Sequence, residues 1–323
     1  MKKEILCFLI VAGVAFQSYA QDSAAPVDTA WRIGSTASIQ FSQVAFDHWA
    51  AGGESSIAIT AIGTGFASYL RGKNFWNSYA YLSYGAYSGQ YDSKIRKNVD
   101  VIDIGTKAGH DLGKKFYLTG LVNFKSQFAD GYNYPNLDTV VSTWLAPGYL
   151  LVSAGIDWRP VDYFSLYLSP ATGKFTFVSD QTIADLGTYG NDPAVYDSIT
   201  GVLISHGKTI RSEFGALFVV TFAKDLIKNV NLTTKATFFN NYTDKVKANR
   251  GNIDVNWDLL LTMKVNSWLA ATVYGALIYD NDIFIQDLDH DTGLSKGTGG
   301  PRTQLKEGIG ISLTYTIGDE ARK

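Results

Sequence analysis

The stretch Asn252–Asn266 constrains the fold of this chain more than any other. Its odd-numbered positions are apolar and include Ile253 and Trp257, whereas most of its even-numbered positions are polar and include Asp254 and Asp258. This alternation places the two sets on opposite faces of a β-strand, while a helix would mix them around its circumference. The stretch exceeds the usual strand of about five or six residues. Because about 9–11 residues cross a bilayer, it is typical of a membrane-spanning barrel strand.

Residues 1–20 have the pattern of a secretory signal peptide. Lys2 and Lys3 form a basic start, the apolar run Ile5–Phe16 follows, and a small-x-small cleavage site ends at Ala20. The run is too short to span a membrane as an N-terminal anchor. The sequence therefore predicts export through a cleaved signal peptide.

The remaining residues, 21–323, are expected to form one outer-membrane β-barrel domain. The chain has one cysteine, Cys7, inside the predicted signal peptide, so the exported protein would have no disulfide, thiol catalyst or cysteine metal site. The formal net charge of -2 gives no electrostatic case for nucleic acid as a partner. No later run is long enough for a transmembrane helix, so a membrane-embedded chain must be a closed barrel without free sheet edges.

Connection lengths support the same fold class, an all-β, closed, antiparallel transmembrane barrel. About twelve alternating segments follow one another, an even number. Long and short connections alternate, and the longest are Val178–Gly207 and Asp280–Pro301. In such barrels the short turns face the periplasm and the long loops face the exterior, so both termini are expected on the periplasmic side.

Two of the expected strands contain residues that disturb a strand ladder. The sixth is expected over Thr143–Arg159, with Pro147 inside it, and the seventh begins at Tyr163 and is interrupted at Pro170 and Gly173. Proline cannot donate to a strand ladder, so bulges or bends are expected. Two interpretations remain open: an inward plug or lateral exit, and an irregularity at the barrel rim.

Alternation alone does not say which face points outward. A soluble barrel would turn the apolar set inward, but about twelve strands enclose more space than apolar side chains are expected to fill. A secreted β-sandwich avoids this objection, although the strands are long for one. We therefore expect the apolar face to contact outer-membrane lipid.

The opposite face carries charges of both signs, which the barrel would turn toward its lumen. These candidate lumen-lining residues are Asp103, Lys107, Lys125, Arg211, Glu213, Lys235, Asp254, Asp258, Lys264 and Lys306. Each buried charge needs a partner or water. Two interpretations follow: a polar solute path, and an internal salt-bridge network that fills the barrel.

The segment Asp287, Asp289 and Asp291 resembles a calcium-binding loop. The match is poor, because Gly293 comes one position late and the twelfth position is Thr298 rather than glutamate. A solvated acidic loop is the alternative. No other metal or cofactor pattern is present, so no cofactor is expected.

Catalytic patterns are also missing from the sequence. It contains no HExxH, P-loop or GxSxG motif. An outer-membrane lipid hydrolase would pair a serine with a histidine on the lipid-facing surface, but His48, His110, His206 and His290 do not fall mid-strand beside a serine on the apolar face. The chain is therefore not expected to be an enzyme.

Several short motifs, taken in order, resemble the domain-of-unknown-function family 3078 (DUF3078). They are HWAAGGE at His48–Glu54, NFKSQFADGY at Asn123–Tyr132, LSPATGKFT at Leu168–Thr176, FFNNY at Phe238–Tyr242, IDVNW at Ile253–Trp257 and IYDND at Ile278–Asp282. The resemblance implies a bacterial outer-membrane barrel and supplies no activity. The chain departs from the family pattern at His48, where asparagine is expected, and at Gly318–Lys323, which follow the last strand.

Two functions are compatible with these features. The first is a porin-like passive channel or transporter of small solutes in a Gram-negative outer membrane. The second is an accessory or interaction barrel that binds other outer-membrane or periplasmic proteins through its long loops. A lipid hydrolase is a third alternative.

Overall fold

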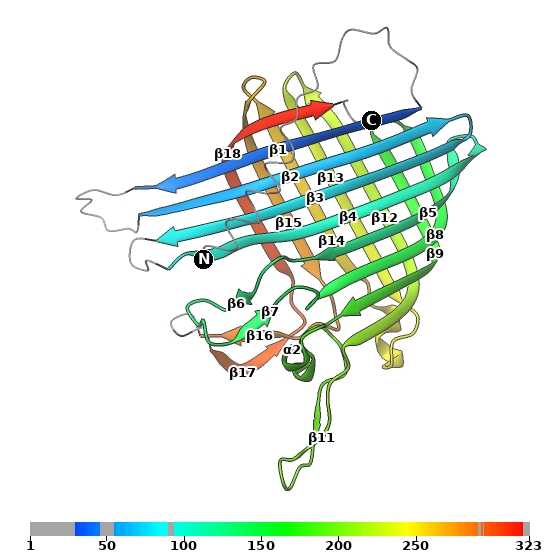
Figure 1. Ribbon diagram of the computed structural model, residues 1–323. Helices are drawn as coiled ribbons and strands as arrows, with labels where there is room; N and C mark the ends of the chain where they lie inside the picture. The colour runs from blue at the N-terminus through cyan, green and yellow to red at the C-terminus, as the bar shows by residue number, and fades with distance from the viewer. Residues whose placement is uncertain (1–29, 46–54, 90–93, 290–291, 293, 319–323) are drawn as a thin grey trace. The chain divides into compact units, whose positions relative to one another are not determined.

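The computed structural model describes residues 30–45, 55–89, 94–289, 292 and 294–318. Within them, twelve long strands alternate with shorter elements: β1 (Trp31–Val44), β2 (Ser56–Arg71), β3 (Asn74–Gly89), β4 (Arg96–Gly113), β5 (Phe116–Ser126), β8 (Gly148–Val161), β9 (Phe164–Phe177), β12 (Ile210–Ile227), β13 (Val230–Asn241), β14 (Asp254–Lys264), β15 (Leu269–Tyr279) and β18 (Gln304–Gly318). They form a closed barrel in the ring order β1-β18-β15-β14-β13-β12-β9-β8-β5-β4-β3-β2 (Figure 1). All neighbouring pairs are antiparallel. The predicted fold class is confirmed, while the predicted signal peptide lies outside the described residues.

The alternation of apolar and polar residues that predicts β14 agrees with how the strand pairs with β13. Trp257 lies opposite Ala236 on β13, and Asp258 lies opposite Lys235. Trp257 is exposed on the outer surface, whereas Asp258 reaches Lys125 on β5. Because β5 and β14 are not neighbours in the ring, only a side chain that points into the lumen can make this contact. The apolar row therefore faces outward.

Connection lengths alternate around the barrel as expected. Tight turns join β2 to β3, β4 to β5, β8 to β9, β12 to β13 and β14 to β15. The other end carries longer segments with small elements of their own: β6 (Gly131–Tyr132), β7 (Val140–Ser142), α2 (Gln181–Leu186), β10 (Val195–Tyr196), β11 (Leu203–Ser205), η1 (Lys247–Gly251), β16 (Ile285–Leu288) and β17 (Ser295–Gly300). Figure 1 shows α2, β6, β7, β16 and β17 gathered at this end.

The sixth barrel strand starts later than the sequence predicts. Residues from Thr143 to Pro147 form a turn, in which Thr143 and Ala146 exchange backbone hydrogen bonds of 2.9 Å each, and β8 begins at Gly148. Leu145 has a φ of 55°, and its backbone N–H donates to Ser126 Oγ at 3.2 Å rather than to a neighbouring strand. The expected extension of the strand back to Thr143 is therefore wrong.

The seventh barrel strand, β9, is continuous but contains a bulge at Pro170. The register shifts against both of its neighbours at this point. Ser169 supplies the local hydrogen bonds: its Oγ donates to Ala154 O at 2.7 Å and accepts from Ala171 N at 3.3 Å. The bulge lies within the strand, with ladder pairs on either side, so the expected interruption of the strand at Gly173 is wrong.

The lumen contains an apolar core that the alternation of the strands does not predict. Tyr167, Leu217, Val219 and Phe239 are buried together, with Leu121 and Leu151 packed against them. Leu217 lies opposite Phe239. Lys235 and Asn241 have the same parity as Phe239, that is, they are an even number of residues away on β13 and share its lumenal face. The expectation that apolar side chains do not fill a barrel of this size therefore does not hold at this core, beside β5, β8, β9, β12 and β13.

A second small core lies among the connections at the long-loop end. Ala146, Val178, Ile183 and Ala184 are buried together. Asp180 caps α2, because its carboxylate accepts from Ile183 N at 3.0 Å, and Gly187 ends the helix with a φ of 67°. Helix α2 lies within the predicted loop Val178–Gly207, and its six residues are too few to show helical periodicity in the sequence. In the part of the chain that the structure describes, no helix has the length and apolarity needed to cross a membrane.

Candidate functional site

The charges predicted to line the lumen form clusters at different heights. A contact between strands that are not neighbours in the ring must cross the interior, so such contacts identify lumenal side chains. The central cluster contains Asp103, Lys125, Lys235 and Asp258, together with Tyr79.

The central cluster bridges opposite walls of the barrel. Lys125 Nζ lies 3.5 Å from Asp103 Oδ2 and 3.8 Å from Asp258 Oδ2. Lys235 Nζ on β13 lies 3.4 Å from the hydroxyl of Tyr79 on β3. Five strands separate β3 from β13 in either direction around the ring, so the two strands face each other. The lumen is therefore constricted at this height.

Tyr79 is fixed on its own side of the constriction. Its hydroxyl donates to Asp103 Oδ1 at 3.0 Å, and Asn123 Nδ2 donates to the same hydroxyl at 3.0 Å. The Tyr79 ring covers Gly105 on β4, where even a Cβ atom would collide with it. A glycine at that position therefore lets the ring lie against the wall.

A second cluster, the upper cluster, lies nearer the long-loop end and is centred on Lys174. Its ammonium lies 2.8 Å from Asp254 Oδ2, 3.2 Å from Asp280 Oδ2 and 3.6 Å from Glu213 Oε2. The carboxylates come from β14, from the segment after β15 and from β12. One lysine thus holds several strands and one connection together from inside the lumen.

Arg211 extends the upper cluster toward the same connection. It pairs with Glu213 at 2.8 Å and with Asp282 in a short contact. Asn241 Nδ2 donates to the same Glu213 oxygen at 3.1 Å. These contacts fix the segment after β15 to the wall at β12.

A third cluster, the wall cluster, joins side chains of β3, β4 and β8 on one side of the lumen. Lys107 Nζ and Arg159 Nε contact the same Asp157 oxygen, at 2.8 and 2.6 Å. The Arg159 guanidinium lies 3.8 Å from the centroid of the Phe75 ring. Stacking on an aromatic ring and pairing with a buried carboxylate both suit arginine.

The remaining predicted lumen residues lie near the two ends. Lys306 Nζ on β18 donates to Asn98 O on β4 at 3.2 Å, a contact that also crosses the interior. Lys264 has lumenal parity with Asp258 and lies exposed at the last position of β14. Whether any of these charges binds a solute stays a prediction.

Sequence reasoning missed Tyr79, Asp157, Lys174, Asp280 and Asp282. Asp157 and Tyr79 fall at alternating positions of clear strands, so parity could have identified them. Lys174 follows the bulge at Pro170, which shifts the parity, and the two aspartates lie after the end of a strand. The lumenal contacts of Lys174, Asp280 and Asp282 therefore become visible only in the folded structure.

Part of the lumen is open to water along β14. The Asp258 side chain is 50% exposed, and Leu260, which has the same parity, is 39% exposed. Lys264 lies further along the same face, and Lys306 belongs to the same cross-strand row as Asp258. Asp258, Leu260, Lys264 and Lys306 thus form a column of solvated side chains that runs beside the central cluster.

The predicted calcium loop lies in the β16–β17 segment. Asp287 contacts Arg302 at 2.6 Å and accepts from Thr298 Oγ1 at 2.8 Å, and Asp289 accepts from Thr292 N at 3.1 Å. Asp291 lies outside the described residues. Among the described residues no group of three or more His, Cys, Asp or Glu side chains is arranged to hold a metal. The calcium site stays a prediction.

Two histidines contact polar partners, while His48 and His290 lie outside the described residues. His110 Nδ1 lies 2.7 Å from Asn74 Oδ1, and His206 Nδ1 lies 2.9 Å from Asp185 Oδ2. The hydrogen bond with His206 lowers the pKa of Asp185, and Gln181 adds to this effect. These contacts organise a turn and a loop, and nothing in them shows catalysis.

The closed ring, apolar outer surface and charged lumen together define a β-barrel of the outer-membrane type. A family model described as "Protein of unknown function (DUF3078)" matches residues 41–132. The match confirms the family resemblance over this part of the chain. The chain has no match among curated proteins.

Solved structures with a similar fold include a translocator domain, an outer membrane channel and a porin. The translocator domain of autotransporter NalP from Neisseria meningitidis is 11% identical with a TM-score of 0.36, covering 96% of this chain and 97% of that one. The COG4313 outer membrane channel from Pseudomonas putida F1 is 12% identical with a TM-score of 0.39, covering 94% and 100%. The NanC porin is 8% identical with a TM-score of 0.37, covering 86% and 98%. At these values the likeness carries no argument about function.

We predict that Lys174→Gln lowers the free energy of unfolding by about 3–5 kcal/mol, because it leaves buried carboxylates without their cation. Urea unfolding of the folded protein in detergent or lipid measures the change. Lys264→Gln is the matched control, since Lys264 is exposed, and its effect should stay within about 0.5 kcal/mol. Equal effects of the two substitutions would contradict the role given to the upper cluster.

Proposed function

We propose that this protein is a narrow outer-membrane channel for small polar solutes, with its path along the β14 side of the lumen. The supporting observation is the column of solvated lumenal side chains that passes the central cluster. Asp258 on this column is half exposed although it belongs to the central cluster that bridges opposite walls. A lumen closed by an apolar core at every height would leave no such carboxylate in water.

The central cluster determines which solutes this channel would favour. Lys125 and Lys235 contribute two positive charges, and Asp103 and Asp258 contribute two negative charges. The Tyr79 ring lies among them. A balanced set of charges gives weak discrimination between anions and cations, so size and polarity would select the solute.

The upper cluster gives the same path a narrow entrance. Lys174 and Arg211 hold Asp280 and Asp282 against the wall, which draws the segment after β15 over the lumen. Solute would enter beside this segment, on the side where Lys306 is exposed. The proposed channel is therefore small compared with an unobstructed barrel of twelve strands.

We predict that Tyr79→Ala raises the single-channel conductance several-fold, because it removes the ring that narrows the lumen. Planar-bilayer recording of the purified, folded protein measures the change. Leu82→Ala is the control, since Leu82 lies on the same strand with outward parity. Lys125→Glu in the same recordings should shift the reversal potential toward cation selectivity. If the wild type and both lumenal variants showed no conductance, the channel proposal would be overturned.

One further observation favours a second candidate function, an interaction barrel. The hairpin of β10 and β11 projects away beyond α2 (Figure 1). Its exposed apolar side chains are Val195, Tyr196, Ile199, Val202, Leu203 and Ile204. Ile199 at the tip is 93% exposed. A contiguous apolar set on an external projection marks a protein-binding surface.

The hairpin tip is held in shape by Asp197. Its carboxylate accepts from Thr200 N at 2.7 Å, from Thr200 Oγ1 at 2.9 Å and from Ile199 N at 2.9 Å. These hydrogen bonds, led by the one from the Thr200 backbone, lower the pKa of Asp197. The only acidic side chain of the tip is thus used within the turn, which leaves an apolar tip of defined shape for a partner.

We predict that a photo-crosslinking residue at Ile199 gives a discrete protein adduct in intact cells, because this side chain offers the most exposed apolar contact. The control is the same residue at Lys247, exposed on another loop of the same end. Ile204→Ser should abolish the adduct without changing the folded yield. Equal crosslinking at both positions, or labelling of lipopolysaccharide alone, would count against a protein partner.

A further inference from the structure

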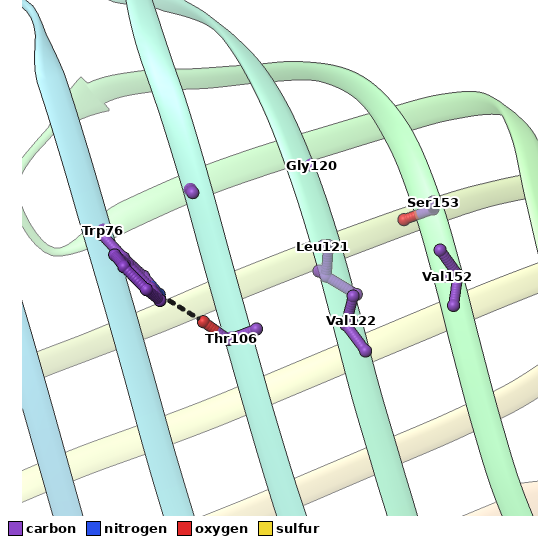
Figure 2. Close-up of a pocket in the computed structure, with 8 residues that line it drawn as sticks. Trp76, Thr106, Gly120, Leu121, Val122, Val152 and Ser153 are labelled. Atoms are coloured by element: carbon purple, nitrogen blue, oxygen red, sulfur yellow. Dashed lines mark hydrogen bonds between the residues drawn. The ribbon is translucent and has the colours of Figure 1, made fainter.

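The outer surface of the barrel has a hollow of about 290 Å³ over β3, β4, β5 and β8. Most of the residues that line it have outward parity: Trp76, Thr106, Ala108, Gly120, Val122 and Val152. Figure 2 shows Trp76 at one side and Val122 and Val152 at the other. A hollow on this surface faces the hydrocarbon of the membrane.

Small side chains create the hollow. A Cβ atom added to Gly120 would meet only Ser153 O, at 4.0 Å, so the space above Gly120 is open. Ala108 lies opposite both Trp76 and Gly120 in the two strand pairs. The floor is therefore formed by Ala108 and Gly120, between larger outward neighbours.

The polar atoms at the hollow are satisfied within the protein. Trp76 Nε1 donates to Thr106 Oγ1 at 2.6 Å (Figure 2). Thr106 Oγ1 also lies 2.8 Å from Ser78 Oγ. These bonds hold the indole ring along the edge and leave an apolar surface for an occupant.

The turns nearest the hollow carry a group of lysines. Lys73 lies in the turn before β3, and Lys114 and Lys115 form the turn between β4 and β5. The backbone N–H of Asp111 donates to Lys73 O at 2.8 Å, which brings the two turns together. All three lysines are exposed, and the structure records no ion pair for them with any described residue.

Aromatic rings lie between these lysines and the hollow. Phe116 stacks on Trp158 with 6.2 Å between ring centroids, and Trp31 lies 5.9 Å from Trp76. Aromatic side chains are enriched at the level of lipid headgroups. Because short turns face the periplasm, the lysines lie at the headgroups of the periplasmic leaflet.

We propose that the hollow and the adjoining lysines form a binding site for one phospholipid of the periplasmic leaflet. An acyl chain lies in the hollow, and the phosphate contacts Lys73, Lys114 and Lys115. The site needs the membrane orientation of the barrel but does not depend on whether the barrel conducts.

The dimensions of the surface suit this occupant. Gly120 lies five residues along β5 from Lys115, which is about 16 Å of strand at ~3.3 Å per residue. A strand tilt of about 40° reduces this to about 13 Å of depth, within the ~15 Å hydrocarbon of one leaflet. A lipid whose phosphate is at the lysines thus reaches the hollow with its chain.

Charge distinguishes the site from ordinary lipid contact. Inside the bilayer one apolar surface has no hydrophobic preference for another, so a hollow alone would exchange lipids freely. Juxtamembrane lysines attract anionic lipid by about 1 kcal/mol each. Affinity for one phospholipid therefore requires both the lysines and the hollow.

Native mass spectrometry of the purified, folded protein with added phosphatidylglycerol tests the proposal. We predict one lipid retained per chain, with retention reduced about tenfold or more when Lys114 and Lys115 are both replaced by glutamine. Gly120→Leu, which fills the hollow, should also reduce retention several-fold. Gly65→Leu is the control, because Gly65 has outward parity on β2 and a Cβ there would meet only Gly34 O at 3.9 Å.

Each outcome bears on the proposal. Equal retention by the wild type, the double lysine variant and Gly120→Leu would mean an ordinary lipid annulus and would overturn it. Competition by inorganic phosphate with no effect of Gly120→Leu would assign the lysines to a free anion instead, and would also overturn it. Conductance recorded on the same samples separates failure of this site from failure of the channel.

Discussion

The absence of water from bilayer hydrocarbon is the constraint on which the rest of the structure depends. Each backbone N–H and C=O in a spanning segment must be paired, so the strands have to close into a ring without free edges. Closure together with period-two alternation then decides where every side chain goes. In β14 it sends Trp257 to the lipid and Asp254 and Asp258 to the lumen. A charge in that position is costly unless it is paired or solvated, and both solutions occur: Asp254 pairs with Lys174, and Asp258 remains half in water.

The lumenal contacts give the family resemblance a physical meaning. The motif Leu168–Thr176 supplies Lys174, Ile253–Trp257 supplies Asp254, and Ile278–Asp282 supplies Asp280 and Asp282. The motif Asn123–Tyr132 supplies Asn123 and Lys125 to the central cluster. Stretches far apart in the sequence thus meet inside the barrel. All four stretches contribute side chains to the lumen, although only Asn123–Tyr132 lies within the residues that the family model matches.

Patterns repeated along whole strands could be predicted from the sequence, while local departures could not. The strand number, the alternation of loop lengths and the outward apolar face follow from period two and closure, and they are confirmed. The turn at Thr143–Pro147 and the bulge at Pro170 depend on local hydrogen bonds of the Ser126 and Ser169 side chains. The apolar core around Leu217 could not be predicted, because apolar residues on the lumenal face interrupt the alternation of apolar and polar positions and so hide which face is lumenal. The pairing of Lys174 with Asp280 was out of reach, since parity says which face a residue occupies but not what it meets across the lumen.

The orientation of β14 is the central claim, and cysteine accessibility tests it directly. In a Cys7→Ser background, Trp257→Cys and Asp258→Cys place a thiol at neighbouring positions of one strand. In liposomes, a membrane-impermeant maleimide should modify the thiol at position 258 from the lumen and leave the thiol at position 257, which lipid covers, unmodified. Modification at position 257 with protection at position 258 would contradict the account, because the apolar row would then face water and the charged row would face hydrocarbon.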